Sequence, residues 1–209
     1  MSRKGCLVII SGFSGAGKGT VVKALMERFD CYALSISATT RQPRPGEENG
    51  REYFFKTKEE FEELIRKDAL YEYAQYVSNY YGTPKAYVEE QLEAGKDVIL
   101  EIEVQGALKV KEKNPDALLL FVTPPSAQEL KRRLEGRGTE TPEVIEERMA
   151  RAAQESLLMN KYDYLVVNDQ LDECVETVHQ LIQREHLRMT SNQDMVAKIK
   201  KELSEMKGE

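Results

Sequence analysis

A glycine-rich loop between a predicted strand and a predicted helix constrains the fold of this chain more than any other feature. The loop consists of Gly12, Phe13, Ser14, Gly15, Ala16, Gly17, Lys18, Gly19 and Thr20. The apolar run Leu7–Ser11 precedes it, and the helical pattern Thr20–Phe29 follows it. Glycines let backbone N–H groups converge on phosphate oxygens, the helix N-terminus adds partial positive charge, and Lys18 can reach the β- and γ-phosphates. Strand, glycines, lysine and helix in this order predict a loop that binds the phosphates of ATP.

The loop departs from the usual pattern at one position. A Ser or Thr normally follows the lysine and ligates magnesium, but here Gly19 follows and the hydroxyl comes one residue later, on Thr20. Thr20 is therefore the candidate ligand for Mg²⁺, either directly or through a bridging water.

Alternating strand and helix patterns predict the fold class. Buried parallel strands are expected at Leu7–Ser11, Val98–Glu103, Leu118–Thr123 and Tyr164–Val167. Helices are expected at Thr20–Phe29, Lys58–Lys67, Lys85–Ala94, Ala127–Leu134, Pro142–Met159 and Leu171–Leu187. The sequence therefore predicts an α/β fold in which helices flank a parallel sheet that carries the phosphate loop.

Two insertions divide the single predicted domain of 209 residues. The core comprises residues 1–34, 95–125 and 160–187. Residues 35–94 are too long for one crossover and form a lobe, while residues 126–159 form an arginine-rich helical hairpin that is expected to act as a lid. The tail, residues 188–209, has Met195, Ile199 and Leu203 at helical spacing. It could pack on its own core or pair with another subunit as a homodimer, and the sequence favours neither.

Composition excludes several classes of protein. Apolar residues make up 41% of the chain and charged residues 32%, which predicts a folded core, and no apolar run is long enough to span a membrane. The net charge of −6 argues against a nucleic-acid surface. The three cysteines are scattered and form no CxxC pair, which indicates reduced thiols. We expect the protein to act in the cytoplasm.

A loop that binds ATP suggests transfer of its terminal phosphoryl group, and the histidines and arginines indicate which kind of acceptor receives that group. The only two histidines, His179 and His186, lie in the last long helical pattern and are interpreted as surface or half-buried helix residues. A hydroxyl acceptor would need a general base, whereas a phosphate acceptor, with a second pKa of about 6, is largely a dianion at neutral pH. The arginines suited to binding two phosphorylated substrates are Arg41 and Arg44 in the lobe and Arg133, Arg137 and Arg148 in the hairpin. Arg132 and Arg151 are interpreted as facing solvent.

Several motifs besides the loop resemble those of the guanylate kinase family. They are SATTRQPRPGE, NGREYFF, NYYGTP, EIEVQGA, LEGRGTET and VVND, and the resemblance covers roughly residues 5–187. It implies ATP-dependent phosphorylation of GMP, and of dGMP, in purine nucleotide metabolism. It also implies that Mg²⁺ is the cofactor and that the enzyme is of the bacterial type. The lobe would then bind the monophosphate.

The resemblance also implies roles for individual residues. Those expected around the GMP phosphate are Ser37, Arg41, Arg44, Tyr53 and Tyr81, and those expected to read guanine are Glu72 and Thr83. Asn168 would lie near the adenine of ATP, and Arg137 and Arg148 would neutralise the transferring phosphoryl group. The role of Glu72 also has a direct chemical reason, because guanine presents adjacent N1–H and N2–H₂ donors that a carboxylate can accept. Tyr80 is interpreted as a packing residue.

Two further carboxylates belong to the predicted GMP site. Glu101 and Glu103 are expected to end a buried strand, where a period of two places both on the same face. The family usually has an Asp at the second position, so Glu103 is a departure. The sequence does not decide whether Glu103 contacts guanine, magnesium-bound water or an arginine.

Two other functions compete with this prediction. One is a protein-binding module that resembles guanylate kinases but lacks catalysis, against which the intact Lys18 loop and the hairpin arginines argue. The other is a kinase for a different monophosphate, such as AMP or dTMP, which Glu72 with Thr83 disfavours.

Overall fold

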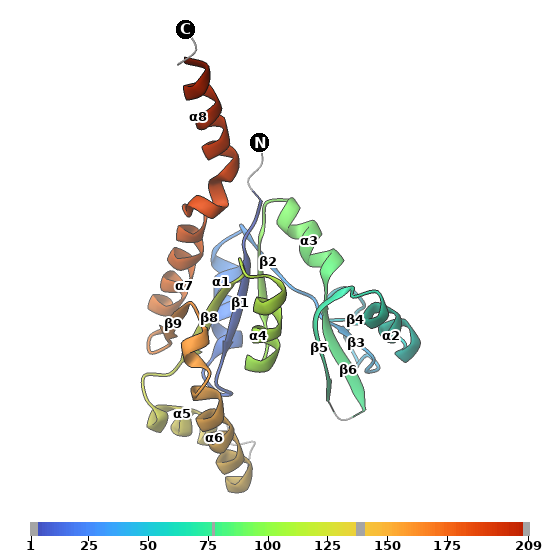
Figure 1. Cartoon of the computed structure of the whole chain (residues 1–209). Helices are drawn as coiled ribbons and strands as arrows, with labels where there is room; N and C mark the ends of the chain where they lie inside the picture. The colour runs from blue at the N-terminus through green and yellow to red at the C-terminus, as the bar shows by residue number, and fades with distance from the viewer. Residues whose placement is uncertain (1–3, 77, 137–140, 207–209) are drawn as a thin grey trace.

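The computed structural model describes residues 4–76, 78–136 and 141–206, and a five-stranded parallel sheet lies at its centre (Figure 1). The strand order is β2 (Tyr32–Leu34), β7 (Asp97–Glu101), β1 (Leu7–Gly12), β8 (Leu118–Thr123) and β9 (Tyr164–Val167). Each neighbouring pair is parallel, so every connection crosses over the sheet and places a helix on one of its faces. The predicted α/β fold class is confirmed.

Helices cover both faces of this sheet. They are α1 (Lys18–Arg28), α3 (Lys85–Glu93), α4 (Val104–Lys113) and α7 (Leu171–Glu185). The hairpin helices α5 (Ala127–Glu135) and α6 (Pro142–Ser156) lie beyond the carboxyl ends of the strands (Figure 1). All of β1 is buried, and its side chains alternate between two hydrophobic clusters. Val8 and Ile10 pack in the cluster that contains α1 and α7, whereas Leu7 and Ile9 pack in the cluster that contains α3 and α4. The alternation follows from the period of two along a strand.

The sequence alone does not predict β2 or α4. Strand β2 has only three residues, too few for an apolar pattern. Helix α4 was missed because the strand was expected to continue to Glu103. Instead β7 ends at Glu101, and Glu103 is the residue that precedes the first turn of α4, with φ −67° and ψ 153°. The expectation that Glu103 lies in the strand is therefore wrong.

Residues from the predicted lobe form a second sheet of four strands. Its order is β4 (Phe54–Phe55), β3 (Ala38–Thr39), β6 (Asn79–Pro84) and β5 (Leu70–Tyr76), and α2 (Lys58–Arg66) packs with it. Ala38, Phe61 and Leu70 form a small core of their own. The ring of Tyr80 stacks on Phe61 with centroids 5.3 Å apart, which confirms Tyr80 as a packing residue.

The helical hairpin and the tail complete the described chain. Leu130 and Leu134 of α5 and Ile145 of α6 join the cluster that contains α1 and α7, so the hairpin packs on the main core. Beyond α7, the short helix η2 (Met189–Asn192) leads into α8 (Gln193–Met206), which extends away from both sheets (Figure 1). Among the described residues, no helix is both long and apolar enough to cross a membrane.

Phe121 provides a test of the central core. It is 1% exposed, and its ring meets those of Phe13 and Tyr162 edge to face, each with centroids 5.0 Å apart. Phe121→Ala should lower the free energy of unfolding by about 3–5 kcal/mol, because it leaves a cavity beneath the phosphate loop. Leu157→Ala, at a residue 80% exposed, is the matched control and should change it by less than about 0.5 kcal/mol. Chemical denaturation measures both, and equal stability of the two variants would contradict the packing described.

Candidate functional site

The phosphate loop lies at the carboxyl end of β1 and opens directly into α1. The helix begins at Lys18, two residues earlier than the sequence predicts, and Gly17 precedes its first turn with φ 89°. Thr57 and Ser126 cap α2 and α5 with their side chains, whereas no described side chain caps α1. The N–H groups of its first turn are therefore available to an anion, as the predicted loop requires.

Gly12, Gly15 and Gly17 of the loop have positive φ and cannot be replaced without strain, and two of them also show what the loop packs against. Gly12 has φ +143°, and a Cβ atom there would lie 2.0 Å from the carbonyl oxygen of Val122. Gly17 has φ +89°, and its Cβ would lie 2.5 Å from Nδ2 of Asn168. The loop conformation thus depends on close contact with β8 on one side and with Asn168 on the other.

Lys18 and Glu101 define the charge at this end of the sheet. The Lys18 ammonium donates to the carbonyl oxygens of Gly12 (2.8 Å) and Phe13 (3.0 Å), which folds it back over the loop. Glu101 ends the neighbouring strand β7, and its Oε1 lies 3.5 Å from the position of a Cβ on Gly19. Desolvation raises the pKa of Glu101 and Lys18 opposes this, although the residue stays open to solvent. A carboxylate beside a phosphate loop is suited to a divalent cation that also binds phosphates.

Thr20 lies in the first turn of α1 and is exposed. No group of three or more His, Cys, Asp or Glu that could hold a metal ion occurs within residues 4–76, 78–136 and 141–206. The Thr20 hydroxyl and the Glu101 carboxylate are oxygen ligands of the kind that Mg²⁺ prefers when phosphates and water supply the remaining ligands. The residues present therefore fit a metal that enters with its nucleotide.

Asn168 stabilises the phosphate loop through hydrogen bonds. Its side chain is buried, and Nδ2 donates to the carbonyl oxygen of Ala16 at 2.9 Å. Its backbone N–H donates to Thr123 at the end of β8. The contact of Asn168 with adenine remains a prediction, but its side chain already holds the loop in place.

One hairpin arginine reaches the loop. Arg148 of α6 contacts the Oγ of Ser14, as its predicted role requires. Arg133 instead pairs with Glu129 on its own helix, as does the largely exposed Arg132, and these two arginines lower the pKa of Glu129 to about 2. Arg137 lies outside the described residues.

A cavity of about 560 Å³ lies next to the loop, between the second sheet and the start of α4. The predicted residues that line it are Ser37, Tyr53, Glu72, Tyr81, Glu101 and Glu103. The lining residues that the sequence did not single out are Tyr73, Ala74, Gln75, Gly82, Ile102, Gln105, Gly106, Lys109 and Arg151. Glu101 belongs both to this cavity and to the surroundings of the loop, so the two binding regions adjoin.

Glu72 is held firmly in this cavity. The buried hydroxyl of Thr83 donates to its Oε1 at 2.9 Å. Burial raises the pKa of Glu72, while the Thr83 hydrogen bond and the charge of Lys109 lower it. A Cβ on Gly106 would lie 3.3 Å from Oε2, so this glycine leaves room for the carboxylate. The cavity therefore presents a fixed acceptor to a ligand with adjacent N–H donors.

Glu47 organises the two lobe arginines. Its Oε1 accepts from the Arg41 guanidinium at 2.9 Å, and its Oε2 accepts from the backbone N–H of Arg44 at 2.7 Å. The Arg41 guanidinium also lies over the ring of Tyr53, 5.3 Å from its centroid, and Tyr53 meets Tyr81 edge to face at 6.1 Å. Arg41 is therefore connected to the cavity through Tyr53, whereas Arg44 is not among the described residues that line it.

Glu103 contacts an arginine, which resolves one of the alternatives that the sequence left open. The Arg151 guanidinium of α6 pairs with the Glu103 carboxylate, and its Nε donates to Oε1 of Glu155 at 3.0 Å. The Arg151 side chain is 58% exposed, so the prediction that it faces solvent is only partly right. It also lines the cavity and connects the hairpin to the start of α4.

Sequence reasoning missed Glu47, Gly106, Lys109 and Arg151. Glu47 and Gly106 end or lie within motifs already noted, PRPGE and EIEVQGA, and could have been found there. Lys109 and Arg151 had no such signal. They reach the cavity only because α4 and α6 run beside it.

Neither histidine lies at this site. His179 hydrogen-bonds the Tyr32 hydroxyl through Nδ1 (2.7 Å) and stacks on Phe29. His186 is 6% exposed, more buried than predicted, and its Nε2 lies 2.8 Å from Oδ1 of Asp97 at the opposite end of β7. A histidine base at the loop is thus excluded.

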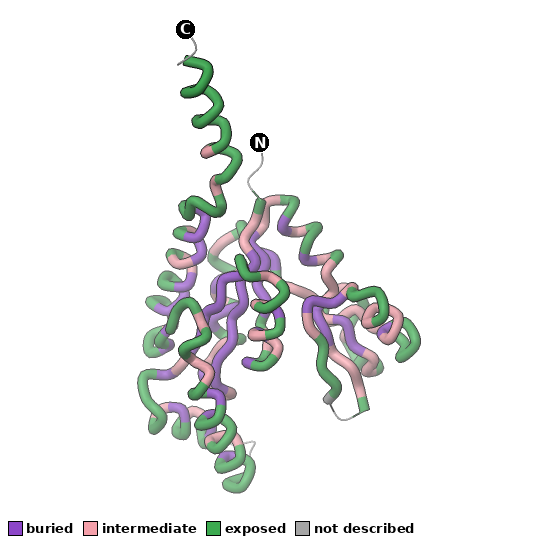
Figure 2. Tube along the Cα trace, viewed as in Figure 1, coloured by how far each residue is buried: buried purple, intermediate pink, exposed green. Residues whose placement is uncertain are grey.

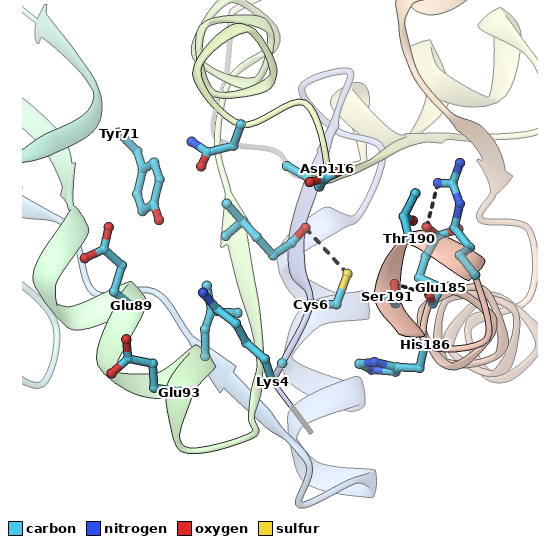
Figure 3. Close-up of a pocket in the computed structure, with 16 residues that line it drawn as sticks. Lys4, Cys6, Tyr71, Glu89, Glu93, Asp116, Glu185, His186, Thr190 and Ser191 are labelled. Atoms are coloured by element: carbon cyan, nitrogen blue, oxygen red, sulfur yellow. Dashed lines mark hydrogen bonds and ion pairs between the residues drawn. The ribbon is translucent and has the colours of Figure 1, made fainter. Parts of the chain in front are cut away.

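A second cavity of about 500 Å³ lies at the amino ends of the strands (Figure 3). Glu89 and Glu93 of α3 lie on one side, and Glu185 and His186 lie on the other. Its lining includes four carboxylates, from Glu89, Glu93, Asp116 and Glu185, against the two cations of Lys4 and Arg188, and it is remote from the phosphate loop. The cavity beside Glu72 is therefore the better candidate for an anionic substrate.

Comparisons with known proteins agree with this geometry. A family model described as guanylate kinase matches residues 4–185. A guanylate kinase from Latilactobacillus sakei subsp. sakei is 52% identical over 190 residues, 90% of this chain and 94% of the relative. One from Caldanaerobacter subterraneus subsp. tengcongensis is 50% identical over 202 residues, 97% and 98% of the two chains. The crystal structure of guanylate kinase from Anaplasma phagocytophilum superposes with a TM-score of 0.68 at 30% identity, covering 90% of this chain and 89% of that one.

Lys109→Met tests the electrostatics of the cavity. Because Lys109 lowers the pKa of Glu72 in the native protein, its removal should raise that pKa further above the ordinary value for Glu. The titration of the Glu72 carboxyl carbon followed by NMR measures the shift. Lys111→Met is the matched control, because Lys111 pairs with Asp163 instead. An unchanged Glu72 titration in Lys109→Met would show that this charge does not act on the carboxylate.

Proposed function

The chain belongs to the guanylate kinase family, and we propose that it phosphorylates GMP to GDP with ATP as the phosphoryl donor. The observation that carries the proposal is the Glu72 carboxylate, fixed by Thr83 in a cavity that adjoins the phosphate loop. dGMP carries the same base and phosphate and should also react. The reaction would then belong to purine nucleotide metabolism.

The base is selected at Glu72. A carboxylate accepts the N1–H and N2–H₂ donors of guanine together, and charge-assisted hydrogen bonds are the stronger kind. Adenine lacks this donor pair and would leave the partly buried carboxylate without the two hydrogen bonds that guanine donates. A site built to bind donors discriminates strongly against a ligand that lacks them. Gly106 supports this role by leaving space at Oε2.

The acceptor phosphate would be held by the residues around Arg41. We assign Ser37, Arg41, Arg44, Tyr53 and Tyr81 to it. The Arg41 guanidinium is oriented by Glu47 and Tyr53 before any ligand arrives, which reduces the entropy lost on binding. The acceptor is already anionic, so the reaction needs charge neutralisation and not a general base.

The donor would occupy the phosphate loop, Gly12 to Thr20. We assign Lys18 and Arg148 to the charge that develops on the transferring phosphoryl group, with Arg137 as their partner from the hairpin. Mg²⁺ supplies neutralisation of the ATP phosphates when bound, and Thr20 and Glu101 are the residues that would hold it, the former directly or through water. Catalysis then comes from in-line positioning of the two phosphates and from fixed positive charge.

The parts of the chain have separate tasks in this proposal. Residues 1–34, 95–125 and 160–187 form the donor-binding core, residues 35–94 the GMP-binding lobe, and residues 126–159 a lid that closes and excludes water. We further propose that the enzyme works in the cytoplasm, where its three cysteines, which form no disulfide with one another, would stay reduced.

A substrate panel tests the choice of acceptor. With ATP and Mg²⁺, ADP release should be fast with GMP and dGMP and much slower with AMP, CMP, UMP or dTMP. Glu72→Gln should lower kcat/KM for GMP at least about tenfold, because an amide can accept at only one of the two positions. Glu89→Gln, a carboxylate of the remote cavity, is the matched control and should leave it unchanged. No turnover with any monophosphate would instead favour a non-catalytic, protein-binding module.

Lys18→Ala tests the donor site. Removal of this charge should lower kcat by about 100-fold or more, while circular dichroism and the thermal midpoint stay near those of the native protein. Lys23→Ala is the control, since Lys23 is exposed on the same helix and pairs only with Glu27 in the described contacts. Activity within a few-fold of native in Lys18→Ala would contradict the assignment of the loop.

A further inference from the structure

Helix α6 packs on the core through a narrow face. Three of its fifteen residues are buried, Ile145, Ala152 and Glu155, and Figure 2 shows most of the helix exposed. Ile145 and Ala152 join the cluster that contains α1 and α7. Elements with few buried apolar contacts shift most easily, so the polar contacts of α6 have a large share in fixing its position.

Two arginines of α6 reach different parts of the site. Arg148 donates to Oγ of Ser14 in the phosphate loop. Arg151 pairs with Glu103, and both residues line the cavity of about 560 Å³. Residues three apart on a helix are neighbours on its surface, so the two guanidinium groups leave the same side of α6. A shift of the helix that breaks one of these contacts would therefore move the other arginine as well.

Arg151 is also held by a buried carboxylate of its own helix. Its Nε donates to Oε1 of Glu155 at 3.0 Å, and the Glu155 side chain is 11% exposed. Its Nη2 donates to the Glu103 carboxylate. A planar guanidinium that binds two carboxylates through different nitrogens has a defined orientation. Arg151 thus forms an ordered link between α6 and the residue that precedes α4.

Glu103 has the length that this link requires. It precedes the first turn of α4 in an extended conformation, where the shorter side chain of Asp accepts hydrogen bonds from the N–H groups of the turn. Among the described contacts, Glu103 makes no such capping hydrogen bond, and its carboxylate is directed to Arg151 instead. Its side chain therefore makes a contact that spans 48 positions of sequence in place of a local one.

We propose that Arg151 is a positioning residue, whose pairing with Glu103 holds α6 where Arg148 meets the phosphate loop. The inference rests on the proposed function, in which Arg148 stabilises charge on the transferring phosphoryl group. A small displacement of such a group can cost much of the rate. The pair itself is exposed, 58% for Arg151 and 70% for Glu103, so it adds little to stability. Its effect should therefore appear in phosphoryl transfer more than in folding.

A double-mutant cycle tests the pairing. Glu103→Gln leaves Arg151 bound to the buried Glu155 and should slow phosphoryl transfer, followed by rapid quench at saturating ATP and GMP, about fivefold. In an Arg151→Gln background the same change should have no further effect, because the link is already lost. Arg132→Gln breaks an ion pair within α5, is the matched control and should keep the native rate. A native rate in Glu103→Gln, or a loss that persists without Arg151, would overturn the proposal, the latter because Glu103 would act on its own.

Glu103→Asp separates positioning from stability. The shorter side chain keeps its charge and can cap α4, but it does not reach Arg151. The transfer rate should therefore fall as in Glu103→Gln, while the thermal midpoint stays at or above the native value and the KM for GMP stays near it. A raised KM for GMP with a native transfer rate would instead show that residue 103 contacts the substrate directly, contrary to the proposal.

Hydrogen exchange tests the link without any turnover. Loss of the pair should speed amide exchange in Pro142–Ser156 in both Glu103 variants of the free protein but not in Arg132→Gln, as measured by mass spectrometry. Unchanged exchange in both Glu103 variants would overturn the link even in an active enzyme. A native chain without turnover on any monophosphate would refute the proposed function and leave the exchange result unaffected, so the two proposals can fail separately.

Discussion

Strand β1 pairs in parallel with β7 and β8, and this pairing determines where the chemistry can occur. It brings the end of β1, the end of β7 and the end of β8 to one edge of the sheet. Gly12 then lies against Val122, the loop turns into α1, and Glu101 ends beside Gly19. The phosphate loop and the first carboxylate of the cavity beside Glu72 are therefore adjacent because three strands share a direction, as expected for ligand sites in open α/β sheets.

The two lobes attach to this edge through different interactions. The hairpin contacts the loop through Arg148 and the start of α4 through Arg151, so one helix touches both binding regions. The second sheet contributes Glu72 from β5, fixed by Thr83 from β6. Antiparallel pairing of these two strands sets that contact, so the pair proposed to read guanine depends on the register of a small sheet with a small core of its own.

Local features could be predicted from the sequence, and long-range ones could not. The loop, α1 and the four longer core strands follow from patterns within a few residues, and all were found. The boundary at Glu101 was missed because the alternation Glu101-Ile102-Glu103 reads equally well as a strand, and only the start of α4 ends it. The expected closeness of Glu101 and Glu103 was right for a different reason, since the chain turns into α4 at the same cavity.

Contacts between residues that lie far apart in the sequence could not be predicted from a local sequence pattern. Arg151 was expected to face solvent because a single arginine on a helix normally does, and its contact with Glu103 spans 48 positions of sequence. Lys109 likewise acts on Glu72 only because α4 packs along β5. Charge on one helix gives no information about the carboxylate that a neighbouring strand will bring to it.

Burial raises the pKa values of Glu72 and Glu101, and a lysine acts on each carboxylate in the opposite direction. Two carboxylates face one cavity and both are partly desolvated, which disfavours their charged forms. Lys109 lowers the pKa of Glu72 and Lys18 lowers the pKa of Glu101, so each lysine opposes the effect of burial on one carboxylate. A guanine base would supply N–H donors at Glu72, and a Mg²⁺ ion, when bound with the nucleotide, would offset the negative charge of Glu101. Ligand binding would therefore stabilise an arrangement of charge that is unfavourable in the free protein. The affinity of each substrate would then depend on the free energy lost when folding desolvates these carboxylates.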